Sequence, residues 1–267
     1  MSSYEIFRRL HEGPSPLRLP NAWDAGSARL FESMGASAIA TTSAGVAWAQ
    51  GYPDGGRLPA EVALQVAASM ARVLTAPLSI DMENGYSDDP AAVAGMARRL
   101  IDLGVAGINI EDGTNAPALL AAKIEAIKNA AAKSGSNLFV NARTDVYLAG
   151  LVDGPKRVGE TLARGAVYRE AGADGLFVPG VVAPEDIAAI VEGAGLPINV
   201  LAWPGLAPAD ALGKLGVRRL SAGSGISQML WGQAEELAKD FIQAGRSESM
   251  AEGAMSYARI QALFVGA

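Results

Sequence analysis

The sequence contains no cysteine and only one histidine, His11, among its 267 residues. Without cysteine, the chain can form no disulfide, no thiolate metal site and no cysteine nucleophile. A single histidine excludes a polyhistidine zinc site and disfavours a serine–histidine catalytic pair. His11 falls in the first helical stretch, ahead of the rest of the fold, and we expect it at the surface.

Positive charge and long apolar runs are also scarce. Lysine and arginine total 22 against 28 aspartates and glutamates, so the net charge is -6. A nucleic-acid-binding protein would carry a basic surface instead. No apolar run approaches the roughly 18 residues that a membrane span needs, and the opening MSSYEIFRRLHEG lacks the apolar centre of a signal peptide. We therefore expect a cytoplasmic protein that binds neither nucleic acid nor membrane.

Hydrophobic residues make up 50% of the chain and recur in short runs. Several of these runs are continuous rather than alternating, which is typical of strands buried on both faces. Eight such runs predict strands at about 17–21, 37–43, 77–82, 106–111, 137–143, 174–179, 197–202 and 217–222.

Helical patterns fill the intervals between these strands. Most begin at a capping residue or a proline and end at a glycine, as helices commonly do. The joints MGASAIA, LGVAGINI, AGADGLFV and LGVRRLS each place a glycine just before a strand. The predicted helices lie at about 24–35, 59–74, 89–104, 119–135, 155–172 and 184–195, with two more at 224–244 and 247–264.

Eight strands that each precede a helix predict a TIM-type (β/α)8 barrel, an α/β fold. The alternative is a doubly wound open sheet, but the chain has no G-x-G-x-x-G loop of the kind that binds dinucleotides in such folds. A barrel of this type usually has about 250 residues. We therefore expect residues 1–267 to form a single barrel domain with extra C-terminal helices.

Carboxylates follow two neighbouring strands, at the end of the barrel where active sites lie. Asp81 and Glu83 come at the end of the third run, and Glu111 and Asp112 at the end of the fourth. Three acids held together would repel one another and raise each other's pKa unless a hard cation joined them. Asp81, Glu83 and Glu111 therefore predict a Mg²⁺ site, whereas Asp112 is expected to cap a helix or pair with an arginine.

Other polar residues end further strands. Arg143, in NARTD, could pair with the acids or hold a substrate carboxylate, and we favour the second role because a metal would already neutralise the acids. The small residues at 41–47 let backbone N–H groups approach an anion. Asp54, in the turn-rich stretch after them, could reach the waters of the metal or only hold a turn. Asn199 is a candidate substrate contact, and Trp203 a candidate apolar wall.

With these motifs in this order, the sequence resembles the isocitrate lyase/phosphoenolpyruvate mutase superfamily, and in particular members that resemble carboxyvinyl-carboxyphosphonate phosphorylmutase and methylisocitrate lyase. The resemblance runs from about Leu19 to the helix after Ser221. It rests on LPNAWDAGSARL, TTSAGVA followed by GYPDG, SIDMENGY, GINIEDG, NARTD and GADGLFVPG.

The resemblance implies a set of site residues. Asp81 would bind Mg²⁺, or Mn²⁺ as a substitute, with Glu83, Glu111 and Asp54 acting directly or through water. The substrate's oxygens would be bound by residues of the second strand end and by two polar side chains. These substrate-binding residues are Ser43, Ala44, Gly45, Arg143 and Asn199, and the catalytic residues are Arg143, Glu111 and Asp54.

The chain also departs from the pattern of the superfamily. The lyases carry a lysine-lysine-cysteine-glycine-histidine loop after the I-E-D strand, and this loop is absent here. The mutases place a lysine and an asparagine there; Asn115 is the only candidate for the asparagine, and Lys123 lies in a helical stretch. Gly180 occupies the position that holds glutamate or histidine in the superfamily.

The resemblance therefore implies the shared chemistry of the superfamily rather than one familiar reaction. We expect a Mg²⁺-dependent lyase or decarboxylase that cleaves a C–C bond of a small α-keto or 2-hydroxy (di)carboxylic acid through a metal-bound enolate. A phosphonate P–C enzyme (phosphonomutase or phosphonopyruvate hydrolase) and a non-catalytic keto-acid-binding protein are the alternatives. The resemblance also implies a homo-oligomer, a dimer or usually a tetramer, whose terminal helix is exchanged between subunits.

Overall fold

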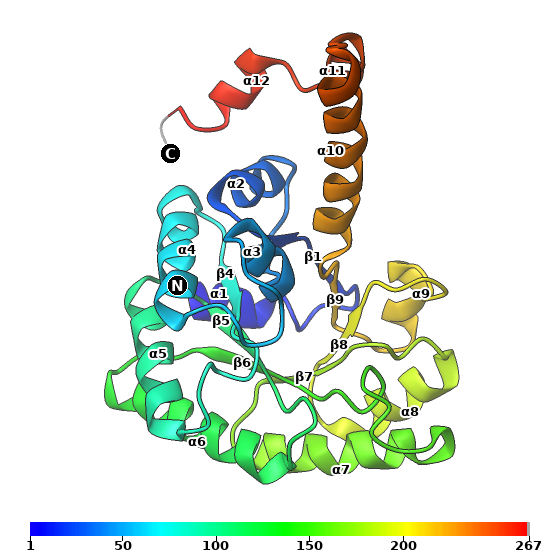
Figure 1. Cartoon of the computed structure of the whole chain (residues 1–267). Coiled ribbons are helices and arrows are strands. Elements are labelled where there is room, and N and C mark those ends of the chain that lie inside the picture. Colours follow the sequence, from blue (N-terminus) through cyan, green and yellow to red (C-terminus); the bar gives the residue numbers. More distant parts are fainter. Residues whose placement is uncertain (266–267) are drawn as a thin grey trace.

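A computed structural model, which describes residues 1–265, shows nine parallel strands arranged as a barrel inside a ring of helices (Figure 1). The strands pair in the order β1-β9-β8-β7-β6-β5-β4-β3-β2. The predicted TIM-type fold and all eight predicted strand positions are confirmed. The strands are β1 (Leu17–Leu19), β2 (Asn21–Ala22), β3 (Ile39–Thr41), β4 (Leu78–Asp81), β5 (Gly107–Glu111), β6 (Phe139–Arg143), β7 (Gly175–Val178), β8 (Ile198–Leu201) and β9 (Arg219–Ser221).

The first predicted strand appears as two short ones because Pro20 interrupts it. Proline has no backbone N–H to donate to a strand partner. On one side of Pro20, β1 pairs with β9 (Leu17 opposite Arg219), and on the other side β2 pairs with β3 (Asn21 opposite Ala40). One stretch of chain thus joins the first and last strands and closes the barrel.

The surrounding helices follow the predicted positions, except that the sequence predicted no helix at Ala209–Lys214, where the structure has one. Asp89 caps the third of them by accepting a hydrogen bond from the Ala91 N–H at 2.9 Å, and a proline follows in the first turn. The helices of the ring are α2 (Ala25–Ser33), α4 (Ala60–Val73), α5 (Pro90–Asp102), α6 (Pro117–Lys133), α7 (Arg157–Glu170), α8 (Pro184–Ala194) and α9 (Ala209–Lys214), with a short 3-10 turn η1 (Gly154–Lys156) before α7.

The two faces of the barrel strands differ in polarity. Side chains alternate along a strand, and those directed at the helices, such as Ile80, Ile108 and Val140, are buried in one large apolar core. The inward face carries polar side chains above a small apolar cluster that includes Leu17 and Phe139. Arg219 of β9 donates a hydrogen bond from Nη2 to Asn109 Oδ1 of β5 at 3.2 Å. Because three strands separate β9 from β5 in the pairing order, this bond crosses the interior of the barrel.

Helix α1 (Ser3–Arg9) closes the amino-terminal end of the barrel. The ring of Phe7 approaches β5 so closely that a Cβ on Gly107 would lie 2.8 Å from Phe7 Cε1. The expectation of a surface histidine is wrong: His11 follows the helix and is only 4% exposed. It stacks on Phe139 with ring centroids 4.4 Å apart and donates from Nδ1 to the Phe7 carbonyl at 2.8 Å. The aromatic floor of the barrel, made by residues distant in sequence, accounts for its burial.

Two helical predictions also need correction. Residues 43–49, for which the sequence predicted no helix, form a short helix, α3 (Ser43–Ala49), which Thr42 caps through the Gly45 N–H at 3.4 Å. The last predicted helix, 247–264, is broken into α11 (Glu248–Ala251) and α12 (Tyr257–Ala262), and Gly253 between them has a φ of +73°. Helix α10 (Gly225–Ala244) forms as predicted and stands away from the barrel in Figure 1.

None of the helices within residues 1–265 combines the length and the apolar character needed to cross a membrane.

The buried histidine predicts a pH-dependent stability. Burial lowers the pKa of His11 to about 3, and the nearby Arg219 charge acts in the same direction. The unfolded chain takes up this proton near pH 6.5 but the folded chain does not, so stability is lost as the pH falls below 6.5. Between pH 8 and pH 4.5 we expect this one residue to cost about 2–3 kcal/mol of unfolding free energy.

Urea unfolding at both pH values, on the native protein and on His11→Asn, measures this loss. Asparagine can still donate to the Phe7 carbonyl but does not titrate, so the variant should lose less stability on acidification. Equal losses in the two proteins would contradict the proposed origin.

Candidate active site

A cavity of about 180 Å³ lies at the carboxyl ends of the strands. It has room for about six waters at the density of the liquid, so it suits a small molecule. One part of its wall is polar or small and the other is apolar. The polar and small residues are Asn21, Thr42, Ser43, Ala44, Asp54, Asp81, Asn109, Arg143, Ser221, Gly223 and Ser224, and the apolar ones are Leu148, Phe177, Pro179, Leu201 and Trp203.

Asp81 ends β4 and is held at this cavity by backbone contacts. Its own N–H donates to Thr41 Oγ1 at 2.7 Å. Its carboxylate accepts from the Ser43 N–H at 3.2 Å, at the first residue of α3, and from the Glu83 N–H at 3.4 Å. The end of β4 and the beginning of α3 are therefore joined through one carboxylate.

A tight turn after β4 directs Glu83 into the protein. Glu83 and Tyr86 have φ values of +51° and +59°, which side-chain-bearing residues seldom adopt. Gly85 fits because a Cβ there would lie 2.9 Å from Val93. One Glu83 oxygen accepts from the Gly56 N–H, and the other, Oε1, is buried without a hydrogen-bond partner in the described structure. A buried carboxylate oxygen of this kind is costly unless a cation or a water satisfies it.

The acids of this region influence one another. Burial is the main cause that raises the pKa of Asp54, Glu83 and Glu111. The charge of Asp81 raises all three further, although Arg143 opposes it. The four carboxylates that the sequence singled out therefore share one electrostatic environment.

These acids are not arranged as a ready-made cage. Within residues 1–265, no three Asp, Glu or His side chains surround one point closely enough to hold a metal directly. Glu111 is instead paired with Arg143, and Glu83 is bonded to Gly56. The donors are nevertheless of the right kind for a hard cation, because Mg²⁺ commonly uses one or two direct carboxylates and keeps several waters.

Arg143 ends β6 with a carboxylate on each side of its guanidinium. Nη1 lies 2.7 Å from Glu111 Oε2, while Nε and Nη2 donate to the two oxygens of Asp145 at 2.6 and 3.0 Å. Burial acts to lower its pKa, but Glu111 and Asp145 outweigh burial and raise it, so the group remains charged. Arg143 is therefore an ion-pair partner of two acids, which is the first of the two roles that the sequence left open, and it also lines the cavity.

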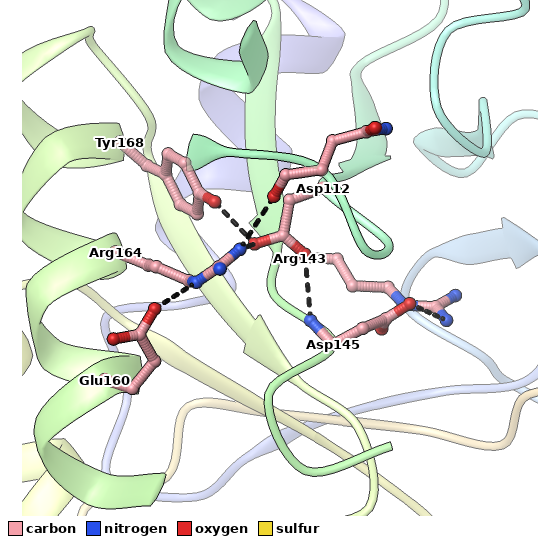
Figure 2. Close-up of polar contacts among 7 residues, drawn as sticks. Asp112, Arg143, Asp145, Glu160, Arg164 and Tyr168 are labelled. Carbon is pink, nitrogen blue, oxygen red and sulfur yellow. Dashed lines mark hydrogen bonds and ion pairs between the residues drawn. The ribbon is translucent and has the colours of Figure 1, made fainter. Parts of the chain in front are cut away.

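Asp112 does not line the cavity. Figure 2 shows its carboxylate between Arg164 and Tyr168 on one side and Asp145 on the other. As predicted, it pairs with an arginine: Arg164 Nη1 lies 2.9 Å from its Oδ2. The Tyr168 hydroxyl donates to the same oxygen at 2.5 Å. The side chain of Asp112 is fully buried, so its negative charge is matched entirely by protein groups.

Several residues singled out in the sequence do not line the cavity. Gly45 packs against Thr42, where a Cβ would meet the Thr42 methyl at 2.7 Å. Asn199 is buried and donates to Ser221 Oγ at 3.0 Å. Asn115 is exposed, and Lys123 is buried in α6 with Nζ on the Asn84 carbonyl at 2.9 Å.

Gly180 has a structural reason to be glycine. Its φ is +85°, and a Cβ would lie 3.2 Å from the backbone nitrogen of Leu148. No larger side chain fits without a shift of the segment that follows β6.

Sequence reasoning missed the buried asparagines of the inner face. Asn21 donates to the Thr41 carbonyl at 2.7 Å and accepts from the Gly223 N–H at 2.9 Å, so it joins both sides of the barrel closure. Asn109 accepts from Asn141 Nδ2 at 2.9 Å and lines the cavity. An asparagine within an otherwise apolar strand, as in AGINI and LFVNA, was the available signal.

Comparison with known proteins adds to this geometry. The sequence model of the phosphoenolpyruvate phosphomutase family matches residues 7–242. An uncharacterized protein of Mycobacterium tuberculosis H37Rv is 43% identical over 223 residues, which cover 82% of this chain and 81% of that protein. A 2-methylisocitrate lyase of Bacillus subtilis is 30% identical, over 72% of this chain and 64% of that protein. An oxaloacetate decarboxylase of Pseudomonas fluorescens is 29% identical, over 82% and 78%.

The fold comparison agrees. A Burkholderia cenocepacia structure, provisionally named a lyase/mutase, superimposes with a TM-score of 0.88 over 98% of this chain and 95% of that chain, at 34% identity. With a family match over most of the chain, the expected resemblance is confirmed. The chain belongs to the phosphoenolpyruvate phosphomutase family and is an enzyme of the PEP mutase/isocitrate lyase superfamily.

Proposed function

We propose that the protein is a Mg²⁺-dependent lyase or decarboxylase that cleaves a C–C bond of a small α-keto or 2-hydroxy dicarboxylic acid. The observation that carries this proposal is the composition of the cavity wall. Arg143 is the one cationic side chain among its lining residues, and the cavity volume is about 180 Å³. A four-carbon acid such as oxaloacetate suits a site with one arginine and room for one metal.

The apolar wall argues against a larger tricarboxylic substrate. Phe177, Pro179 and Leu201 offer no side-chain donor to a third carboxylate, and a carboxylate buried without a partner is costly. Among the relatives, this argument favours the chemistry named for the oxaloacetate decarboxylase over that named for the 2-methylisocitrate lyase.

The carboxylates at the rim fit a divalent cation in their chemistry. Asp81 would hold it directly, and Glu83, Asp54 and Glu111 would act directly or through water, with Mn²⁺ as a substitute for Mg²⁺. The unpartnered Oε1 of Glu83 supports this assignment because it lacks a donor of its own. When bound, the cation would withdraw electron density from the keto and carboxylate oxygens of the substrate.

Residues of the chain would bind the substrate, stabilise the developing charge and exclude water. Arg143 would turn from Glu111 to pair with a substrate carboxylate. At the start of α3 the Ser43 and Gly45 N–H groups bind Asp81 and Thr42. The Ala44 N–H between them would face the keto oxygen, where negative charge develops as the C–C electron pair moves to give an enolate. The apolar wall would keep water from the bond that breaks. The closing proton would come from water, because Gly180 supplies no acid.

A phosphonate P–C enzyme is the second candidate, and the match to the phosphomutase family favours it. Against it, the segment that follows β5 has no lysine, and its Asn115 is exposed. The two candidates differ in the product that they release, so one assay distinguishes them.

We also propose that the protein is a homo-oligomer and that a second copy covers α10, as in a helix exchange between subunits. This helix stands away from the barrel (Figure 1), and Ser227 is its one buried residue. Isolated apolar side chains on a surface are ordinary, but a contiguous group points to an interface. The exposed apolar residues of α10 include Met229, Leu230, Trp231, Phe241 and Ile242, which are 46–80% exposed.

The first prediction here concerns Asp81. The purified protein should release pyruvate from oxaloacetate in the presence of Mg²⁺, and Asp81→Asn should lower kcat/KM by about 100-fold or more, because the direct metal ligand is lost. The control is Asp102→Asn, which makes the same chemical change at an exposed residue of α5 and should leave kcat/KM unchanged. A panel of keto and hydroxy acids, with phosphonopyruvate followed by phosphorus NMR, completes the assay. Absence of turnover on every acid would disprove the lyase, and loss of the P–C resonance would establish the second candidate.

The second prediction concerns Arg143. Lysine keeps the charge but cannot make two parallel hydrogen bonds. Arg143→Lys should therefore raise the KM for the acid about 10- to 100-fold while the affinity for Mn²⁺, measured by electron paramagnetic resonance, stays within about twofold. An unchanged KM would remove Arg143 from the substrate site. Arg98→Lys, at the surface of α5, is the matched control.

The third prediction concerns α10. The double change Phe241→Glu and Ile242→Glu should reduce the mass measured by light scattering to that of one chain, because two charges would be buried in the interface. Gln243→Glu adds charge to the same helix turn at a polar position and should leave the mass unchanged. A native protein that already scatters as a monomer would refute the oligomer.

A further inference from the structure

Behind the cavity, Asp112 joins three parts of the chain with its two carboxylate oxygens. Oδ2 receives the Arg164 guanidinium at 2.9 Å and the Tyr168 hydroxyl at 2.5 Å. Oδ1 receives the Asp145 N–H at 3.0 Å. The side chain of Asp112 is fully buried and that of Arg164 is 11% exposed, so solvent weakens these contacts little.

Asp112 holds the segment that carries Arg143 from both sides. Its N–H donates to the Arg143 carbonyl at 3.2 Å, and its Oδ1 takes the N–H of Asp145, two residues further on. Both carboxylate oxygens of Asp145 in turn accept hydrogen bonds from the Arg143 guanidinium, at 2.6 and 3.0 Å. Asp112 therefore fixes the position of the Arg143 guanidinium indirectly, by holding the backbone of Asp145.

Helix α7 completes this arrangement from outside the barrel. Arg164 is itself oriented by Glu160, one turn earlier, at 2.7 Å from Nε. Figure 2 shows the resulting series of contacts from Glu160 and Arg164, through Asp112 and the Asp145 backbone, to Arg143. None of Glu160, Arg164, Tyr168 or Asp112 lines the cavity.

Arg143 needs this external support because it lies between two acids. Glu111 attracts Nη1, whereas Asp145 attracts Nε and Nη2. An incoming carboxylate can displace Glu111 from one edge only while the other edge remains fixed on Asp145. If the Asp145 backbone moved, the guanidinium would follow Glu111 and turn from the substrate.

We propose that Asp112, Arg164 and Tyr168 are positioning residues, which set the orientation of the Arg143 guanidinium toward the substrate carboxylate. This inference rests on the proposed role of Arg143 in binding substrate. It assigns to α7, a helix of the outer ring, a part in substrate affinity that is separate from the metal ligands.

The test uses Tyr168→Phe, which removes one hydroxyl and keeps the buried ring, and Arg164→Met. The control is Arg169→Met, on the same helix, whose guanidinium contacts the Ala194 carbonyl at 3.0 Å instead. KM and kcat are measured on the acid that the native enzyme turns over. Oxalate, a planar two-oxygen chelator like an enolate of pyruvate, is titrated calorimetrically in Mg²⁺. The ¹⁵N resonance of Arg143 Nε–H is identified by its loss in Arg143→Lys. Its chemical shift reports directly on the hydrogen bond from Arg143 Nε to Asp145.

We expect the two α7 variants to raise KM and the oxalate dissociation constant about tenfold, with kcat changed less than about threefold and Mn²⁺ affinity unchanged. The Arg143 Nε–H resonance should shift in both variants and not in Arg169→Met. Arg164→Lys, which restores a cation beside Asp112, should recover part of the affinity.

Three results would overturn the inference: an unmoved Arg143 resonance with unchanged KM in Tyr168→Phe, equal effects in Arg169→Met, or a loss of Mn²⁺ affinity in step with substrate affinity. A native protein that neither turns over an acid nor binds oxalate would refute the proposed function instead. In that event the Arg143 resonance still decides whether α7 positions this arginine.

Discussion

Repulsion among closely spaced carboxylates shapes the carboxyl-terminal rim of this barrel. Asp54, Asp81, Glu83 and Glu111 approach one another at the ends of strands and in the loops after them, where burial weakens the solvation of their charges. The protein offsets part of that repulsion with Arg143 and with backbone N–H groups from Ser43 and Gly56. What remains is an excess of negative charge beside the polar side of the cavity, which Asp54 and Asp81 line.

The sequence was sufficient for most of the framework, because the framework depends on short-range patterns. Continuous apolar runs indicate buried parallel strands, and capping residues and glycines mark where helices begin and end. Asp112 could also be interpreted correctly, since a fully buried acid outside a metal site requires a cationic partner. The break at Pro20 was not predicted, although the missing N–H of proline explains it.

What could not be predicted depends on contacts between distant segments. His11 has the local pattern of a surface helix, but its ring is buried by Phe139, more than a hundred residues away. Gly45 and Asn199 occupy positions that the motifs assign to substrate binding. In the structure Gly45 packs against Thr42, and Asn199 donates a hydrogen bond to Ser221. The left-handed backbone at Glu83, which turns its carboxylate inward, has no signature in residue type, because glutamate rarely adopts it.

The close approach at Gly180 also limits how this protein can change over generations. A side chain at this position would need space above it, whereas here the Leu148 backbone lies 3.2 Å from where its Cβ would be. A single codon change to glutamate would introduce a clash before it supplied a proton donor. An acid could therefore replace Gly180 only together with a rearrangement of the segment after β6.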